Sequence, residues 1–168
     1  MLNKTEDTFT CRDVALEGGA TLPEVTLAFE TYGTLSPNRD NAILLLHGFA
    51  SHHRAGGDNG WLSGMIGPGR ALDTDRFFII SPNMLGSSFG STGPKSENPA
   101  TGKPYGPDFP EITMVDIVDA EARLVDHFGI MQLAAIVGYS YGGCRTFQWG
   151  VRYPERMRSL VPAASRPQ

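Results

Sequence analysis

Hydrophobic and polar residues alternate in two segments near the start of the chain, residues 9–16 and 22–32. In the second segment Val25, Leu27 and Phe29 recur at every second position. A period of two is typical of a strand that buries one face and leaves the other in water. Both segments are therefore predicted to be strands near the edge of a sheet.

Further along, short runs are apolar without alternation, at residues 42–46, 77–80 and 133–137. Such runs suit central parallel strands that are covered on both faces. Residues 158–163 are interpreted as one more strand. Antiparallel strands followed by alternating strands and helices predict an α/β fold whose later strands are parallel.

A helix is expected between the last two central strands. Thr113 can cap its start, Asp116 suits the positive end of its dipole, and Gly129 can end it. The apolar residues of this helix share one face, namely Ile117, Val118, Leu124, Val125 and Phe128. The carboxylates are interpreted as a solvated face, namely Asp116, Asp119, Glu121 and Asp126.

Residues 86–110 are rich in Gly, Pro and Ser and are predicted to form a loop. A loop of this length within a domain is unusual, and is expected to be either functional or disordered.

The run at 133–137 is followed at once by Gly-Tyr-Ser-Tyr-Gly, with Ser140 at the centre and Gly138 and Gly142 on either side. A buried strand, then G-x-S-x-G, then a helix indicates a nucleophile elbow, which exposes the serine hydroxyl above the sheet. The glycines leave room where backbone segments pack closely. The alternative is a Ser-Gly turn that carries no chemistry.

His47-Gly48-Phe49 ends the third predicted strand. In a fold with this elbow, the loop after that strand and the residue after the nucleophile each supply one N–H group to the oxyanion hole. This assigns the N–H groups of Phe49 and Tyr141, which would stabilise the charge of a tetrahedral intermediate. His47 is interpreted as shaping the loop, because the general base follows the serine in the triad order Ser, Asp/Glu, His.

Other candidate sites in the sequence have less support than the elbow at Ser140. His52 and His53 are adjacent and lack the spacing of metal ligands, so they are interpreted as a solvated loop. Cys144, one helical turn after Ser140, is interpreted as a small core residue. No G-x-G-x-x-G follows any apolar run, and we expect neither a metal site nor a bound cofactor.

The composition of the chain bears on its domain size, its partners and its cellular compartment. A chain of 168 residues, 40% hydrophobic and 19% charged, can bury a real core and suggests one domain or part of one. The net charge of −4 argues against a nucleic-acid partner, and no apolar run is long enough to cross a membrane. The start of the chain lacks a secretory signal, and two isolated cysteines suit a reducing compartment. A cytoplasmic protein without nucleic-acid or membrane partners is expected.

Longer motifs carry a resemblance to a known family. The strings ETYGTLSPNRDNAILLLHG, GPGRALDTDRFFIISPNMLGSSFGSTGP and NPATGKPYGPDFPEIT, together with GYSYGG, resemble the homoserine O-acetyltransferase family from about Glu30 to Pro154. The resemblance implies an α/β-hydrolase core in a longer protein. Residues 1–168 would be the N-terminal portion of its single domain, truncated after the strand that follows the nucleophile helix. The lid and the triad Asp and His would lie outside this portion.

The resemblance also implies a reaction, in which Ser140 takes an acyl group from acyl-CoA and passes it to the hydroxyl of homoserine. The family's oxyanion positions map onto Phe49 and Tyr141. The implied partners are small molecules, acetyl-CoA or succinyl-CoA and homoserine or a related hydroxy amino acid, with acyl-CoA a substrate and not a cofactor. The reaction belongs to methionine biosynthesis, and a full-length relative is expected to be a homodimer.

The chain departs from the family at the elbow, which reads GYSYGGCR where GGSMGGMQ is common. Tyr139, Tyr141, Cys144 and Arg145 are therefore expected where the acyl donor and acceptor are selected. Two alternatives remain open: an α/β-fold serine hydrolase that uses water as the acceptor, and a fragment without catalytic activity.

Overall fold

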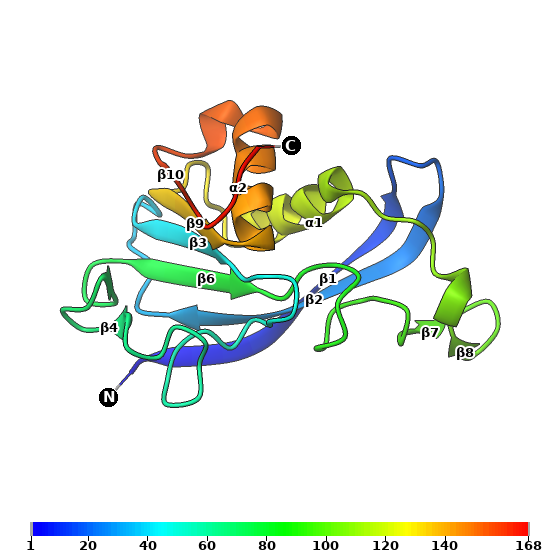
Figure 1. Ribbon diagram of the computed structural model, residues 1–168, viewed down its shortest axis with the longest axis horizontal. Coiled ribbons are helices and arrows are strands. Elements are labelled where there is room, and N and C mark those ends of the chain that lie inside the picture. The colour runs from blue at the N-terminus through cyan, green and yellow to red at the C-terminus, as the bar shows by residue number, and fades with distance from the viewer. Residues whose placement is uncertain (1, 168) are drawn as a thin grey trace.

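Six strands form one twisted sheet in the computed structural model of the chain, which describes residues 2–167 (Figure 1). Their order across the sheet is β1-β2-β6-β3-β9-β10. Their bounds are β1 Lys4–Ala15, β2 Thr21–Tyr32, β3 Ala42–Leu46, β6 Phe78–Pro82, β9 Ala135–Tyr139 and β10 Leu160–Ala163. β2 pairs antiparallel with β1 and β6, and the remaining pairs are parallel. The predicted α/β fold with leading antiparallel strands is confirmed.

The β1–β2 hairpin is the longest pairing in the sheet and begins at Lys4, ahead of the predicted residue 9. The earlier residues of β1 are polar and exposed, because an edge strand needs no hydrophobic side chains to keep its ladder of hydrogen bonds. Only Phe9 and Cys11 of this strand pack partly against the core below the helices, with Val14 fully buried there. The alternating pattern therefore identified the buried part of the strand and missed its polar start.

The central strand β3 separates two hydrophobic cores. Ala42, Leu44 and Leu46 point into the core under the helices, whereas Ile43 and Leu45 point into the core on the opposite face. A strand with both faces buried cannot alternate, which is why its sequence is apolar throughout. β9 begins at Ala135 rather than at residue 133 because apolar runs report burial and not the bounds of hydrogen-bonded pairing.

Helices α1 (Met114–His127) and α2 (Tyr141–Arg152) cover one face of the sheet (Figure 1). The hydroxyl of Thr113 accepts from the Asp116 amide at 3.3 Å, and the Asp116 carboxylate accepts from the Thr113 amide at 2.8 Å. Asp116 also accepts from the Glu17 amide at 2.7 Å and is buried. The interpretation of Asp116 as a solvated carboxylate is wrong, because the cap and the β1–β2 turn enclose it.

The opposite face of the sheet is covered by residues 48–76, which contain only the two-residue strands β4 (Ile66–Gly67) and β5 (Leu72–Asp73). Ala55, Ile66 and Leu72 pack there against the sheet. Within residues 2–167, neither α-helix combines the length and the hydrophobicity that a bilayer-crossing segment needs.

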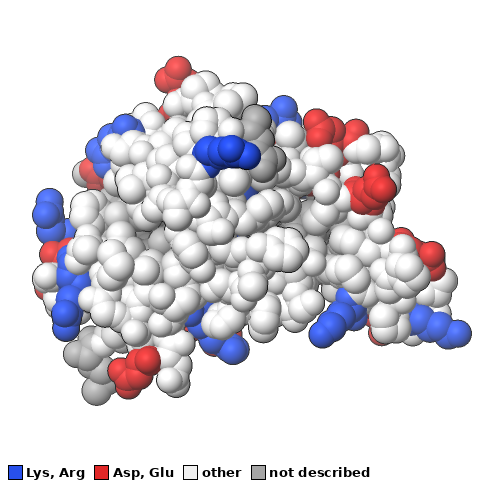
Figure 2. Space-filling model, viewed as in Figure 1, with Lys and Arg blue, Asp and Glu red and all other residues white. Residues whose placement is uncertain are grey.

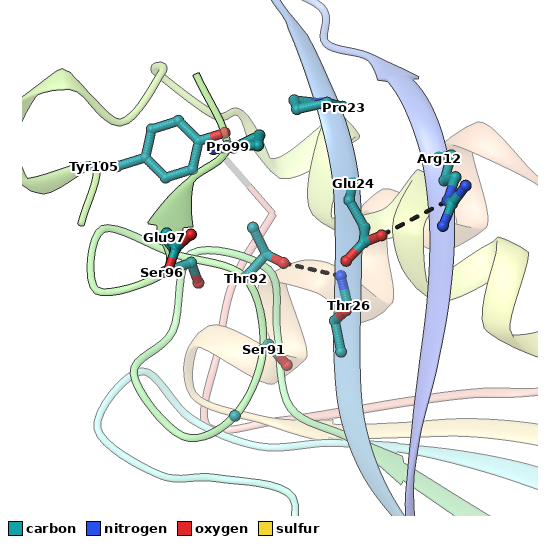
Figure 3. A pocket seen from close by; sticks show the side chains of 11 residues that line it. Arg12, Pro23, Glu24, Thr26, Ser91, Thr92, Ser96, Glu97, Pro99 and Tyr105 are labelled. Atoms are coloured by element: carbon teal, nitrogen blue, oxygen red, sulfur yellow. Dashed lines mark hydrogen bonds and ion pairs between the residues drawn. The ribbon is translucent and has the colours of Figure 1, made fainter. Parts of the chain in front are cut away.

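The segment 86–110 is ordered against β2, and Figure 3 shows the hollow between them. Thr92 donates from its amide to the Thr26 carbonyl at 2.8 Å and accepts from the Thr26 amide at 2.9 Å. The Ala28 amide donates to the Ser91 hydroxyl at 3.1 Å. These bonds tie the segment to the part of β2 that precedes its pairing with β6. The segment also contains β7 (Glu97–Asn98), β8 (Lys103–Pro104) and the 3-10 turn η1 (Gly106–Asp108), and a second such turn, η2 (Pro154–Arg156), follows α2.

Charged side chains on the face drawn in Figure 2 lie mainly around its margin, with acidic and basic groups interspersed. Its centre is uncharged. This face therefore presents no broad basic surface of the kind that binds a phosphate backbone.

Removal of the α1 cap should weaken the fold. We expect Thr113→Ala to lower the free energy of unfolding by about 1 kcal/mol, because the Asp116 amide loses its acceptor. Thr113→Ser keeps the hydroxyl and should stay within a few tenths of a kcal/mol of the unmodified protein. Urea unfolding of the three proteins measures the difference, and equal loss in the Ala and Ser variants would contradict the capping role.

Candidate active site

Ser140 lies on the turn between β9 and α2 with φ 55° and ψ −122°. Few residues other than glycine adopt a positive φ, and such strain persists only where the surroundings enforce it. Here the Ser140 amide donates to the Ala163 carbonyl at the end of β10, at 2.9 Å. The side chain is exposed, as a nucleophile elbow requires.

The two glycines of the elbow stand where no side chain fits. A Cβ at Gly142 would overlap the carbonyl oxygen of Leu46 and lie 2.8 Å from that of His47. A Cβ at Gly138 would overlap the Gly142 carbonyl and lie 2.5 Å from the hydroxyl of Thr146. The first turn of α2 therefore rests directly on the end of β3, and only glycine permits this approach.

The structure brings Phe49 and Tyr141 together beside Ser140. Their rings meet edge to face with centroids 5.7 Å apart. Within residues 2–167 neither main-chain amide donates to another group, and Tyr141 is the first residue of α2, where N–H groups have no partner inside the helix. Unpartnered N–H groups are the kind of donor that an oxyanion hole uses.

His47 shapes the loop after β3, as the sequence predicted. Its Nε2 accepts from the Met84 amide at 3.2 Å, so Nδ1 carries the proton and donates to the Gly48 carbonyl at 2.7 Å. Burial, and next the charge of Arg145, lower the pKa of His47 to about 3. The ring is therefore neutral near pH 7 with both nitrogens engaged, which leaves none to accept a proton from Ser140.

Aromatic side chains surround the mouth of the site. Phe49 is 73% exposed, and the Tyr139 ring lies against Gly48, where a Cβ would be 3.0 Å from the ring. Trp61 stacks on Tyr139 with centroids 5.2 Å apart. Tyr139 and Tyr141 flank Ser140 in the chain, and each packs against another aromatic ring.

A fully buried ion pair lies behind the elbow. The guanidinium of Arg145 on α2 contacts the carboxylate of Glu121 on α1, and both side chains are 0% exposed. The other oxygen of Glu121 accepts from the indole N–H of Trp149 at 2.9 Å. Burial raises the pKa of Glu121, and the Arg145 charge and the Trp149 hydrogen bond act against this rise.

This pair corrects two expectations. Glu121 is not part of a solvated helix face, and Arg145 does not face the substrate. The sequence did indicate that Glu121 faces the core, because Glu121 stands four residues after Ile117 and four before Val125, on the apolar stripe of the helix. The expectation of a solvated carboxylate is confirmed for Asp126, which is exposed. Asp119 is partly covered by its contacts with Arg152 and Tyr153.

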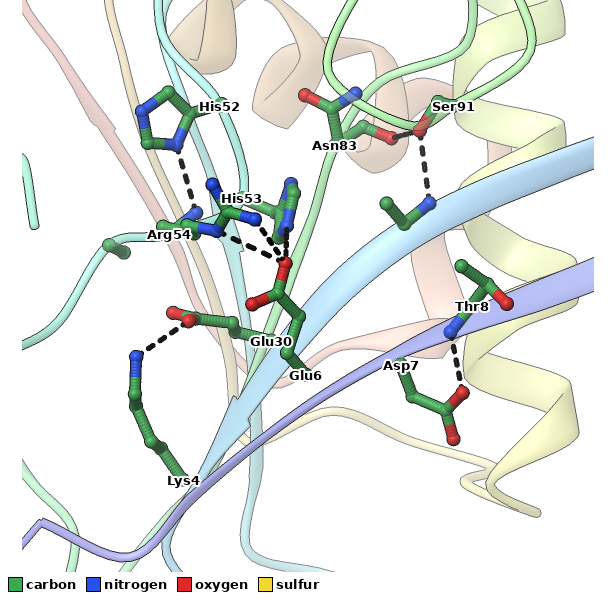
Figure 4. A network of polar contacts seen from close by, with 12 residues as sticks. Lys4, Glu6, Asp7, Thr8, Glu30, His52, His53, Arg54, Asn83 and Ser91 are labelled. Atoms are coloured by element: carbon green, nitrogen blue, oxygen red, sulfur yellow. Dashed lines mark hydrogen bonds and ion pairs between the residues drawn. The ribbon is translucent and has the colours of Figure 1, made fainter.

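The adjacent histidines are also not a simple solvated loop. His53 is buried and contacts the Glu6 carboxylate at 2.9 Å, beside Arg54, which donates to the same oxygen at 2.7 Å (Figure 4). Hydrogen bonds from Arg54, and next from His53, lower the pKa of Glu6 to about 2. His53 thereby ties the loop that carries Phe49 to β1. The part of the chain that the structure describes has no group of three His, Cys, Asp or Glu residues arranged for a metal ion.

A buried tyrosine at the end of β2, Tyr32, hydrogen-bonds the loop that carries Phe49. The hydroxyl of Tyr32 accepts from the amides of Ala55 and Gly56 at 2.9 and 2.7 Å and donates to Glu30. Glu30 is fully buried and pairs with Lys4 at 2.8 Å (Figure 4). Residues 48–60 are therefore fixed without a helix of their own.

Cys144 is half-buried, and its sulfur lies 3.9 Å from the Arg166 carbonyl. It belongs to neither hydrophobic core, so the interpretation as a core residue is wrong.

Residues 41–167 match the family described as the alpha/beta hydrolase fold. The chain belongs to the α/β-hydrolase fold family. Within it, the chain is 54% identical over 159 residues to homoserine O-succinyltransferase of Comamonas testosteroni, covering 90% of this chain and 39% of the relative. The corresponding enzyme of Herminiimonas arsenicoxydans is 49% identical over 167 residues, covering 95% and 43%.

Solved structures of α/β hydrolases extend the likeness. Homoserine O-acetyltransferase from Bacillus anthracis is 36% identical with a TM-score of 0.90, covering 95% of this chain and 46% of that one. Esterase E22 is also 36% identical, with a TM-score of 0.86 and coverage of 92% and 46%. The resemblance to homoserine O-acyltransferases is confirmed. This α/β-hydrolase chain spans about two-fifths of the length of the curated relatives it matches.

Gly142→Ala should disturb the elbow, because its Cβ would overlap the end of β3. We expect a lower melting temperature and at least about tenfold slower labelling of Ser140 by a fluorophosphonate, since both Ser140 and the Tyr141 amide, the expected oxyanion donor, would move. Gly18→Ala is the matched control, with no atom within 4 Å of its added Cβ. Unchanged labelling in the Gly142 variant would contradict the close packing.

Glu121→Gln should destabilise the fold by about 3–5 kcal/mol, because it leaves the buried Arg145 without its counter-charge. Asp119→Asn is the control, since Asp119 pairs with the exposed Arg152 and its loss should cost at most about 1 kcal/mol. Denaturant unfolding compares the two variants, and similar losses in both would contradict a structural role for the buried pair.

Proposed function

We propose that this chain carries the nucleophile and oxyanion hole of a homoserine O-acyltransferase, which moves an acyl group from acyl-CoA to an amino-acid hydroxyl. The observation that supports it is the strained Ser140 turn next to two unpartnered amides, in a chain similar to homoserine O-succinyltransferases. One of the loops that carry this resemblance, residues 86–110, is packed against β2 of the sheet.

The chemistry follows from the placement of these groups. The Ser140 hydroxyl attacks the thioester carbonyl, and the negative oxygen of the tetrahedral intermediate accepts from the N–H groups of Phe49 and Tyr141. The carbon–sulfur bond then breaks and CoA leaves as the thiol, which leaves an acyl-serine. The hydroxyl of homoserine attacks this ester, and collapse of the second intermediate restores Ser140 and releases the O-acyl product.

The proton of Ser140 needs an acceptor. His47 has both ring nitrogens engaged, and His53 is committed to Glu6. We expect the base to be a histidine outside residues 2–167, in the order Ser, Asp/Glu, His that this fold uses. On this proposal, residues 1–168 are the N-terminal portion of one α/β-hydrolase domain.

The remaining expectations follow from the same proposal. The reaction needs no resident cofactor, because acyl-CoA arrives and leaves as a substrate. Acetyl-CoA and succinyl-CoA are both candidate donors, since the relatives named above include an acetyltransferase and succinyltransferases. We expect the whole natural polypeptide to be cytoplasmic and homodimeric.

A second candidate function is ester hydrolysis, which the likeness to esterase E22 favours. Both functions share the acyl-serine and differ in the acceptor, which is water in one and an amino-acid hydroxyl in the other. Selection between them depends on how well the site keeps water from the acyl-enzyme.

The test uses the whole natural polypeptide with acetyl-CoA or succinyl-CoA, with and without homoserine. We expect an acyl adduct on Ser140 by peptide mass mapping, and CoA release that rises when homoserine is added. Ser140→Ala should abolish the adduct and lower turnover by about 10⁴-fold or more. Ser63→Ala, which changes an exposed serine, should leave both unchanged.

CoA release at the same rate with and without homoserine would identify a hydrolase. Absence of any adduct from either donor would overturn the acyltransferase proposal.

A further inference from the structure

Arg145 joins the nucleophile helix to the loop that supplies the other oxyanion donor. One end of its guanidinium, Nη1, contacts Glu121, and the other, Nη2, donates to the carbonyl of His47 at 2.6 Å. The Arg145 side chain is fully buried. A planar guanidinium presents its donors in a fixed fork, so these two contacts determine where the His47 carbonyl lies relative to α2.

The next peptide unit is held by His47 itself. The imidazole Nδ1–H donates to the Gly48 carbonyl at 2.7 Å, and the Ser51 amide donates to the same oxygen at 3.1 Å. No described peptide bond is cis, and in a trans peptide the carbonyl and the following N–H point in opposite directions. A fixed Gly48 carbonyl therefore aims the Phe49 N–H away from the His47 ring.

Glu121 and Trp149 keep the guanidinium in place. Glu121 supplies the counter-charge that a buried arginine needs, and the Trp149 indole holds the other carboxylate oxygen. α1, α2 and the end of β3 thus meet at one charged group. Tyr141, which carries the second oxyanion donor, begins the helix that Arg145 belongs to.

We propose that Arg145 is a positioning residue that sets the Phe49 N–H in register with the Tyr141 N–H, through the carbonyl of His47. The proposal rests on the acyl transfer through Ser140 proposed above. Arg145 touches neither the substrate nor the reacting atoms. Its effect is on the charge of the transition state, because oxyanion donors act where that charge develops.

The Arg145→Lys variant distinguishes a positioning role of Arg145 from a role in stability alone. Lysine keeps the positive charge beside Glu121 but lacks the fork that reaches the His47 carbonyl at the same time. In the whole natural polypeptide we expect kcat to fall about tenfold to a hundredfold with KM for acyl-CoA within about twofold, less than the loss on deleting an oxyanion donor. Arg152→Lys, on the exposed side of the same helix, is the matched control and should keep kcat.

A spectroscopic readout tests the mechanism directly. The carbonyl stretch of an isotope-labelled acyl-Ser140 reports the hydrogen bonds that the oxyanion hole donates. We expect it to move to higher frequency in Arg145→Lys and to stay in place in Arg152→Lys. An unchanged frequency, or a kcat equal to that of the control, would overturn the positioning role. A combined rise in KM and loss of melting temperature, with the frequency unchanged, would also overturn it, since packing alone would explain that result.

The double variant Glu121→Gln/Arg145→Leu provides a second route if the lysine variant does not fold. It removes both buried charges and keeps an acceptor for Trp149. The same fall in kcat and rise in frequency are expected, and their absence overturns the inference. Failure of the proposed function is seen separately, in the unmodified protein: no acyl-Ser140 would remove both proposals, whereas an acyl-serine that transfers only to water leaves the positioning test intact.

Discussion

The whole arrangement depends on the close contact between the first turn of α2 and the carboxyl end of β3. Parallel strands bring their carboxyl ends to one edge of a sheet, and β3 and β9 are neighbours, with Leu46 opposite Gly138. Gly142 then allows α2 to rest on the carbonyls of Leu46 and His47. Without that contact, the amide of Phe49 would not lie near Ser140 and the amide of Tyr141, because Phe49 precedes these two adjacent residues by about ninety positions in the chain.

Buried charged groups lie at this edge on both faces of the sheet. The Arg145–Glu121 pair lies under the helices, and Glu30 with Tyr32 lies under the loop on the other face. Replacement of a buried ion pair by apolar groups is often neutral or stabilising, so such a pair is weak evidence for stability. The value of these groups here is directional: Arg145 donates to the His47 carbonyl, and the Tyr32 hydroxyl, which donates to Glu30, accepts from the amides of Ala55 and Gly56.

Acyl transfer and ester hydrolysis through a serine nucleophile both pass through an acyl-serine, so one arrangement of elbow and amides is compatible with either reaction. This accounts for a chain that is similar both to homoserine O-acyltransferases and to esterase E22. On the proposed function, the elbow and the amides of Phe49 and Tyr141 would stabilise formation of the acyl-enzyme.

The main strands and helices along the chain, the cap at Thr113 and the turn that carries Ser140 could all be predicted from the amino-acid sequence, because they depend on local periodicity and on turns with specific residue requirements. The sequence also predicted that Phe49 lies near Ser140, since the loop after the third strand has a fixed place in this fold. The burial of Glu121, Arg145 and His53 became evident only from the packing of the folded chain. A charged residue is solvated or buried according to the partner that packing brings to it, and that partner here is distant in sequence: Arg145 for Glu121, and Glu6 for His53.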